Sequence, residues 1–294
     1  MGKTIFRIIT LTWLLLFSNF LEASSPISKT EYVFEAEPID VIIPSTAKDR
    51  PILDLCIAGI KNNCPQIRRV IVVSSEKLTD QAEWFDEKLY PFSKEDLALN
   101  LCHGDAKKAS AFLKEKRFVG WYLQQLLKLY APFVIPGISS NVLVLDSDTV
   151  FLNPVDFLNK NQAAKFNPGT EYVRSYFGHA KKLLPGFEKI HSKYSGISHH
   201  MLLQRPVLED LFKRVKEIHH KEFWQAFCLC VDKQYLKSQG ASEFEIYFNF
   251  FLSKSSQSTI RKLRWKNVSS IHHLERYKKL NYHYVSCHDW MRKG

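Results

Sequence analysis

Two aspartates separated by one serine stand near the middle of the chain, in the stretch VLVLDSDTVFLNP. Asp146 and Asp148 directly follow the apolar run Val142–Leu145, so both carboxylates come at the end of a segment that should be buried. Neighbouring carboxylates repel each other, and each is costly in a partly buried place without a positive partner. A hard divalent cation is a natural partner, and it can also bridge to phosphate groups. The spacing therefore favours a site for a divalent cation, unless the pair only forms a solvated turn.

The residues upstream of this pair predict a parallel sheet. Ile39 to Ile43 form a short apolar run closed by Pro44-Ser45-Thr46, which is typical of a buried parallel strand. A helical pattern follows over residues 50–63, and Val70 to Val73 form a second buried strand that ends in Ser74-Ser75. Strand, helix and strand in this order imply a right-handed crossover and parallel pairing.

A longer helical pattern positions the two aspartates. Its apolar positions span residues 119–130, it stops near Pro132 and Pro136, and a loop then leads into the strand Val142–Leu145. The aspartates therefore follow the C-terminal end of a buried strand. In open α/β sheets this is the edge at which ligands bind.

The second half of the chain is less regular. It predicts a strand through His199-His200 to Leu203, a helix that starts near Pro206, and a further helix with Ser242 as its N-cap. No internal repeat or linker follows the polar lead-in at 24–36. Residues 37–294 are therefore predicted to form one α/β domain with a mostly parallel central sheet.

The first 23 residues form a separate unit. Lys3 and Arg7 precede an apolar run from Ile8 to Phe20, and small residues follow where a signal peptidase would cut. The run is shorter than the ~20 residues of a comfortable membrane span, which favours a signal peptide over a signal-anchor. We therefore expect a protein of the secretory pathway, either exported or membrane-anchored through this segment.

Charge and cysteine content bound the partners. The formal net charge of +11 suits nucleic acid, an anionic membrane surface or phosphorylated small molecules. The sequence has no zinc-finger spacing, aromatic RNA-binding motif or dense block of Lys and Arg, so nucleic acid is not expected. The six cysteines are compatible with disulfides or with buried free thiols, and the sequence selects no pairing.

The stretch VLVLDSDTV resembles the motif D-x-D-x-[TV] of the haloacid-dehalogenase phosphatases. That resemblance implies Asp146 as the nucleophile on phosphorus and Asp148 as the acid/base. The family places this motif on its first strand and needs a late acidic pair after another apolar strand. Here two predicted strands precede the motif, and the only later acidic doublet, Glu209-Asp210, lies in an amphipathic helical stretch.

The chain also resembles the GT-A glycosyltransferases over most of residues 37–294. Their first strand and nucleotide loop are similar to DVIIPST, and their donor-binding helix and L-D-x-D strand are similar to GWYLQQLLKLYAP and NVLVLDSDTVFLNP. Their later strand and helix on the acceptor side resemble SGISHHMLLQRPVLEDLFKRV. The GW..QQ..KL, SEFE and HH elements are shared with a poorly characterised bacterial branch, and the likeness extends to glycogenin and the lipopolysaccharide galactosyltransferases.

This resemblance implies a three-layer, GT-A-like α/β/α fold and a metal-dependent transfer. A sugar would move from a nucleotide-sugar donor, expected to be UDP-linked, to a glycan, lipid or protein acceptor. Bound Mn²⁺ or Mg²⁺ would neutralise the diphosphate leaving group. Asp148 would ligate the metal, Asp146 would contact the metal or the donor ribose, and His288, with His283 in reserve, would be a third ligand. Further donor contacts are implied at Pro44, Ser45, Thr46, Ser74, Gln125 and Ser147.

The same resemblance raises a question about the helix before the DxD strand. Gln125 stands roughly where relatives often carry an arginine that faces the donor. Lys128, one turn further on, could replace that arginine, although a solvated lysine on the helix surface is the simpler expectation.

The acceptor side has four candidate residues. Glu243 is the expected acceptor contact or base. Glu245 lies in the capping box S-x-x-E with Ser242, which predicts that it reaches back to the helix start, and an acceptor contact is its second role. Either His199 or His200 could bind acceptor hydroxyls, since adjacent strand residues point to opposite faces. A non-catalytic GT-A-like module that binds carbohydrate or membrane stays open as a third class.

Overall fold

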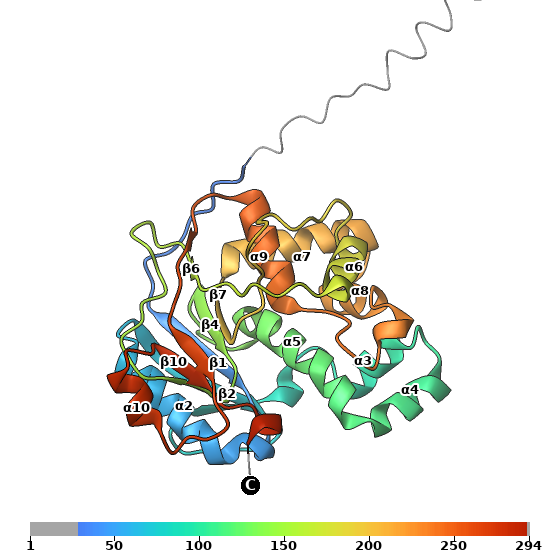
Figure 1. Ribbon diagram of the computed structural model, residues 1–294. Coiled ribbons are helices and arrows are strands. Elements are labelled where there is room, and N and C mark those ends of the chain that lie inside the picture. The colour runs from blue at the N-terminus through green and yellow to red at the C-terminus, as the bar shows by residue number, and fades with distance from the viewer. Residues whose placement is uncertain (1–28, 293–294) are drawn as a thin grey trace, which may run out of the picture.

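The computed structural model describes residues 29–292 (Figure 1). The predicted signal segment, residues 1–23, lies outside this part of the chain, as does the beginning of the lead-in. Within residues 29–292, no helix combines the length and the apolar character that crossing a bilayer requires.

The centre of the fold is a five-stranded sheet in the order β3-β2-β1-β4-β7. β1 (Ile39–Pro44) pairs in parallel with β2 (Ile67–Ser74) on one side and with β4 (Asn141–Leu145) on the other. β3 (Glu83–Asp86) extends the sheet beyond β2 in parallel, and β7 (His200–Gln204) closes the opposite edge antiparallel to β4. Every residue of β1, β4 and β7 is buried, which explains why these strands are almost continuously apolar.

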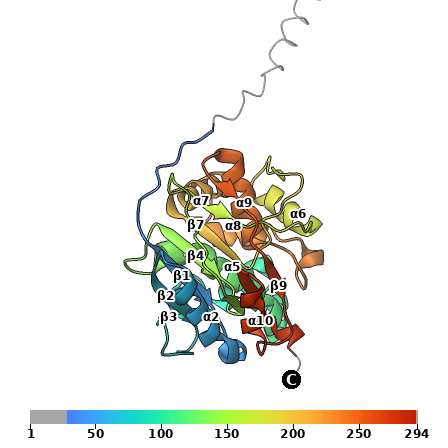
Figure 2. The same ribbon diagram turned by 60° about the vertical axis from the view of Figure 1, so that its left-hand side comes forward.

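Helices cover both faces of this sheet (Figures 1 and 2). α2 (Arg50–Asn63) connects β1 to β2, whereas α5 (Lys116–Val134) leads into β4 and packs on the other face. Opposite faces follow from the right-handed crossover rule, because the chain crosses from β1 to β2 in one direction and from β2 to β4 in the other. The predicted α/β class with a mostly parallel central sheet is confirmed.

Most of the other helices pack with α5 or with one another on its face of the sheet. These other α-helices are α3 (Lys94–Leu101), α4 (Ala106–Lys114), α6 (Arg174–Leu183), α7 (Arg205–His219), α8 (Phe223–Leu229), α9 (Glu243–Lys254) and α10 (Leu274–Lys279). A two-stranded sheet is formed by β6 (Lys165–Phe166) and β8 (Thr259–Ile260).

A second, three-stranded sheet packs against α2 (Figure 2). Its order is β5-β10-β9, formed by β5 (Thr149–Phe151), β10 (Tyr284–Ser286) and β9 (Trp265–Asn267). Gly59 of α2 permits the close approach, because a β carbon there would lie 2.8 Å from the carbonyl oxygen of Phe151. This small sheet brings the C-terminal part of the chain back to the segment that follows the two aspartates.

The structure answers two points from the sequence, the end of α5 and the state of the cysteines. α5 ends at Val134, between Pro132 and Pro136, which is where the sequence predicts the end of this helix, and the N–H of Ile135 donates to the carbonyl of Ala131 at its C-cap. All six cysteines lie within the described residues as buried free thiols, so the alternative of disulfide bonds is not realised.

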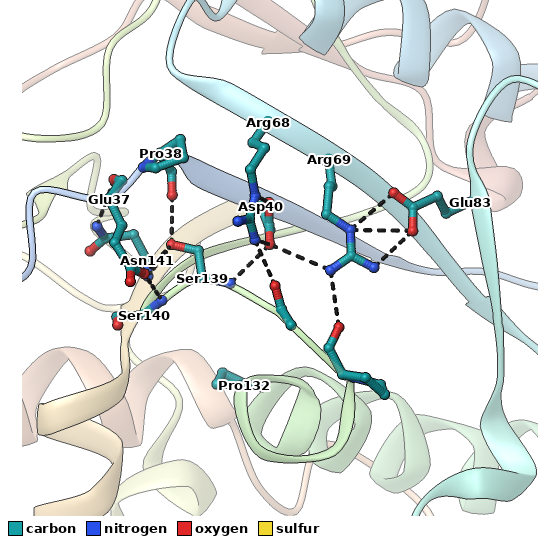
Figure 3. A network of polar contacts seen from close by, with 12 residues as sticks. Glu37, Pro38, Asp40, Arg68, Arg69, Glu83, Pro132, Ser139, Ser140 and Asn141 are labelled. Carbon is teal, nitrogen blue, oxygen red and sulfur yellow. Dashed lines mark hydrogen bonds and ion pairs between the residues drawn. The ribbon is translucent and has the colours of Figure 1, made fainter.

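A buried carboxylate ties the sheet together at the edge opposite the aspartates (Figure 3). Asp40 of β1 is fully buried and accepts hydrogen bonds from Arg68 Nε at 3.0 Å, Arg68 Nη2 at 2.6 Å and the backbone N–H of Ser139 at 2.9 Å. Arg69 extends the network outward to Glu83 on β3, at 2.8 Å. The network therefore joins β1, β2, β3 and the loop that enters β4.

Replacing Asp40 tests this network. Asp40→Ala is expected to lower the free energy of unfolding by about 3 kcal/mol, because a buried N–H and two charged hydrogen bonds lose their acceptor. Urea unfolding measures the loss. Glu83→Ala is the matched control, because its ion pair with Arg69 is half exposed and should contribute at most about 1 kcal/mol. Equal losses in the two variants would contradict the assigned role of Asp40.

Candidate functional site

The two aspartates lie where the chain passes from the large sheet to the small one. Asp146 follows β4 directly, and its backbone N–H donates to the carbonyl of His199 at 3.0 Å. Its carbonyl accepts the N–H of Thr149 at 3.1 Å, which closes a tight turn around Ser147. Thr149 then begins β5, so the turn is anchored on both sides. This geometry places Asp146, Ser147 and Asp148 at the C-terminal edge of the parallel strands, as predicted.

Asp148 is held by residues from the C-terminal part of the chain. β10 pairs antiparallel with β5, and the N–H of Cys287 donates to the Asp148 carbonyl at 2.9 Å. The Asp148 carboxylate accepts a hydrogen bond from Ser286 Oγ at 2.9 Å, and His288 Nδ1 lies 2.8 Å from its other oxygen. The structure thus brings His288 to Asp148. The reserve candidate His283 instead accepts the backbone N–H of Arg264 at its Nδ1.

The pair Asp148–His288 shifts both pKa values toward the charged forms. Burial by itself would raise the pKa of Asp148, but the hydrogen bond and charge of His288 outweigh it and the pKa lies below its usual value. Burial would likewise lower the pKa of His288, yet the same hydrogen bond raises it above the usual value. The two groups therefore form an ion pair around neutral to mildly acid pH.

Asp146 faces a buried lysine. Lys128 Nζ lies 2.7 Å from Asp146 Oδ1 and 2.9 Å from Glu243 Oε1, and its side chain also covers the ring of Phe244. Lys128 is 3% exposed and Glu243 is 5% exposed. Burial would lower the pKa of Lys128, but the two carboxylates raise it well above its usual value. One ammonium group therefore joins α5, the turn Asp146-Ser147-Asp148 (the DxD turn) and the first residue of α9.

The expectation of a solvated Lys128 is wrong. The signal that could have corrected it is the pattern around this residue, because Leu126 and Leu127 precede it and Leu129 and Tyr130 follow it, all buried. A single charge inside such an apolar stretch needs a partner within the fold. The sequence does not name that partner, because Asp146 follows another element, the strand after α5, and Glu243 is 115 residues away.

The start of α9 is fixed by other contacts than a capping box. Ser242 accepts the N–H of Glu245 at 3.2 Å, so Ser242 is the N-cap as predicted. Glu245 does not reach back to the helix start. Its carboxylate instead accepts the N–H of Gly196 at 2.7 Å and Asn249 Nδ2 at 2.8 Å, because Gly196 packs directly on the first turn. Gln125 accepts the N–H of Glu243 at 3.0 Å and is 2% exposed, so its visible role is to hold this helix end.

The two adjacent histidines have different surroundings. The His199 ring stacks on His288 at 5.3 Å and meets Trp265 edge-on at 4.8 Å, so it belongs to the site. His200 is 3% exposed and packs between Phe151 and Phe157. Complete burial among aromatic rings removes His200 from the candidate acceptor contacts.

The predicted donor loop stands at the same sheet edge. Pro44 ends β1, the Ser45 N–H bonds to the end of β2, and Thr46 precedes a short helix over Ala47–Asp49. Ser45 is buried with no hydrogen-bond partner for its hydroxyl among the described residues. The Ser74 hydroxyl donates to a backbone carbonyl within its own loop at 2.6 Å. Contacts from these residues to a nucleotide remain predictions.

The acidic doublet that a dehalogenase-type site would need is engaged elsewhere. Glu209-Asp210 lies on α7, and the Asp210 carboxylate accepts hydrogen bonds from Tyr32 at 2.8 Å and from Arg214 at 2.7 Å. The doublet therefore gives no support to a covalent phosphatase site at Asp146.

Residues 39–281 match a protein family described as "Family of unknown function (DUF6492)". The chain belongs to this family. No curated protein matches the chain. Among solved structures, the apo form of mouse xyloside xylosyltransferase 1 is similar, with 10% sequence identity and a TM-score of 0.41 over 88% of this chain and 99% of the other.

In this DUF6492 protein, Asp148 and His288 can supply some of the ligands of a divalent cation but not a complete set. A carboxylate and an imidazole in direct contact are ligands that Mn²⁺ accepts, and phosphate oxygens and waters can supply the others. Asp146, the second expected ligand, forms an ion pair with Lys128 through its Oδ1 atom. Residues 29–292 hold no group of three or more His, Cys, Asp or Glu side chains arranged around a metal position. The donor set therefore fits a cation that protein and substrate hold jointly.

Removing the buried ammonium should be costly. Lys128→Met is expected to lower the free energy of unfolding by about 3–5 kcal/mol, because it leaves Asp146 and Glu243 without a counter-charge. Adding Glu243→Gln should recover part of this loss, and urea unfolding measures both. Lys182→Met removes a half-exposed pair with Asp232 and should cost about 0–1 kcal/mol. A loss in Lys128→Met as small as in this control would contradict the assigned role.

The ion pair of Asp148 with His288 predicts a pH dependence of stability. The lowered pKa of Asp148 gives stability that is present above about pH 4 and lost as the pH falls. The raised pKa of His288 gives stability that is complete below about pH 6.5 and lost as the pH rises. The difference in unfolding free energy between wild type and His288→Ala, measured in EDTA, should therefore peak near about pH 5. A difference independent of pH, or one matched by the exposed control His272→Ala, would be inconsistent with this pair.

Proposed function

We propose that this protein is a glycosyltransferase that moves a sugar from a nucleotide-sugar donor to an acceptor. The observation that carries the proposal is the meeting of Asp148–His288 with Asp146–Lys128–Glu243 at the ligand-binding edge of a mostly parallel sheet. This set combines a pair suited to a cation, a fixed ammonium and a carboxylate. A diphosphate leaving group and a hydroxyl acceptor need these groups.

Each residue then has a defined task. Asp148 and His288 would hold Mn²⁺ or Mg²⁺, which supplies positive charge for the departing diphosphate when it is bound. Lys128 fixes the Asp146 side chain and contacts Glu243 through Oε1. Glu243, held in place by this contact, is the candidate to orient or deprotonate the acceptor hydroxyl. His199 lines the site beside His288.

The acceptor is proposed to be a glycan, lipid or protein on the secretory route, reached through the signal segment at residues 1–23. An anionic membrane surface is a further proposed partner, in keeping with the net charge of +11. UDP is the proposed carrier of the donor sugar, and this part of the proposal rests on the sequence resemblance alone.

Hydrolysis or transfer of UDP-sugars, with and without Mn²⁺, tests the proposal. Asp148→Asn should reduce the activity by at least about 100-fold, because it removes a preorganised charge next to the leaving group. Its circular dichroism should stay unchanged. Asp80→Asn is the matched control, since this aspartate is exposed and forms an ion pair with the exposed Lys77.

Two results would count against a transferase. A fully active Asp148→Asn variant would remove the metal assignment. Turnover of a generic phosphate monoester that depends on Asp146 would instead favour the phosphatase class.

A further inference from the structure

Trp290 is the most accessible tryptophan among those described, with 76% of its side chain exposed. It belongs to a short 3-10 turn over Asp289–Met291, two residues after His288. A single exposed apolar side chain is common on protein surfaces. The surroundings of this one give it a specific position.

The Trp290 ring continues a stack that begins at the candidate site. Its plane lies at 11° to the His288 ring, with 5.6 Å between the ring centroids. His288 in turn stacks on His199 at 5.3 Å and contacts the Asp148 carboxylate. The exposed indole is thus one ring away from the group that would bind the diphosphate end of a nucleotide.

Two ion pairs fasten the same turn to the loop after β1. Asp289 binds Lys48 at 2.8 Å, and Arg292 Nη2 binds Asp49 at 2.9 Å. Arg292 also donates to the carbonyls of Cys287 at 2.9 Å and Lys48 at 3.3 Å. These contacts hold the turn against residues 47–49, immediately beyond the loop at which the base and ribose are expected.

That loop has no aromatic side chain of its own. Residues 44–50 read PSTAKDR, and the loop after β2, residues 75–82, reads SEKLTDQA. A nucleobase gains about 1–3 kcal/mol from stacking on an aromatic ring, and neither loop supplies such a ring. Another exposed ring is that of Trp84, which lies on the edge strand β3, and its indole N–H donates to the carbonyl of Ser74.

We propose that Trp290 provides the face on which the nucleobase of the donor stacks. The diphosphate would lie at Asp148 and His288, and the base would cover the exposed side of the indole. The C-terminal turn is then part of the nucleotide site. This inference rests on the proposed function, because it requires that a nucleoside diphosphate binds at Asp148.

Calorimetric titration with UDP, with GDP as the purine counterpart, and with inorganic pyrophosphate tests the inference in the presence of Mn²⁺. Trp290→Ala should weaken nucleoside diphosphate binding about 10- to 100-fold, as expected for the loss of one stacking ring. Trp290→Phe should keep the affinity within about threefold, since it retains a flat ring. Pyrophosphate has no base, so its affinity should be the same in wild type and Trp290→Ala. Trp84→Ala is the matched control and should bind like wild type.

Three outcomes would overturn the inference while leaving the proposed function intact. The first is unchanged nucleotide binding in Trp290→Ala. The second is an equal loss of pyrophosphate and nucleotide affinity, because the ring would then act through His288 on the diphosphate end. The third is a loss in Trp84→Ala instead. A wild-type protein that binds neither pyrophosphate nor either nucleotide would overturn the proposed function itself.

Discussion

The buried ammonium of Lys128 joins its own helix to a turn 18 residues further along the chain and to a helix start 115 residues away. It contacts the DxD turn through Asp146 and the first residue of α9 through Glu243, while its own helix packs on the central sheet. An isolated buried charge is strongly unfavourable, so Lys128 is tolerated only when both carboxylates are in place. The same requirement sets the position of Glu243 relative to the sheet edge, and Gln125 adds a hydrogen bond to the Glu243 backbone.

The second half of the site depends on the small sheet. β5 follows the DxD turn and pairs with β10, which places Ser286 and His288 on the Asp148 carboxylate. α2 packs against this sheet through the close contact between Gly59 and the Phe151 backbone of β5. The turn that carries Asp148 is therefore held between two sheets, with the N–H of Asp146 bonded to the large one and the strand after it belonging to the small one. Rigid elements on both sides suit a site that must hold charge in a fixed geometry.

Long apolar segments were readable from the sequence alone. β1, β2, β4 and α2 follow from continuous apolar runs and helical periodicity, and their order implies parallel pairing. Short strands such as β5, β9 and β10 were missed, because three residues carry too little periodicity to be recognised. Ser242 is the predicted N-cap, but the predicted return contact of Glu245 is absent, because its carboxylate accepts the N–H of Gly196 from another segment.

By itself, the sequence determined that Asp146 and Asp148 stand at the C-terminal end of a buried strand in a mostly parallel α/β domain. The resemblance to GT-A glycosyltransferases added two expectations, a late histidine as a third metal ligand and Glu243 as the acceptor contact or base. Only the tertiary structure decided that Lys128 neutralises Asp146 and Glu243, that His288 and not His283 meets Asp148, and that His200 is enclosed in the core. The physical reason is that local patterns report which residues are buried and in which element. The partner of a buried charge is selected by long-range packing, which brings together residues more than a hundred positions apart.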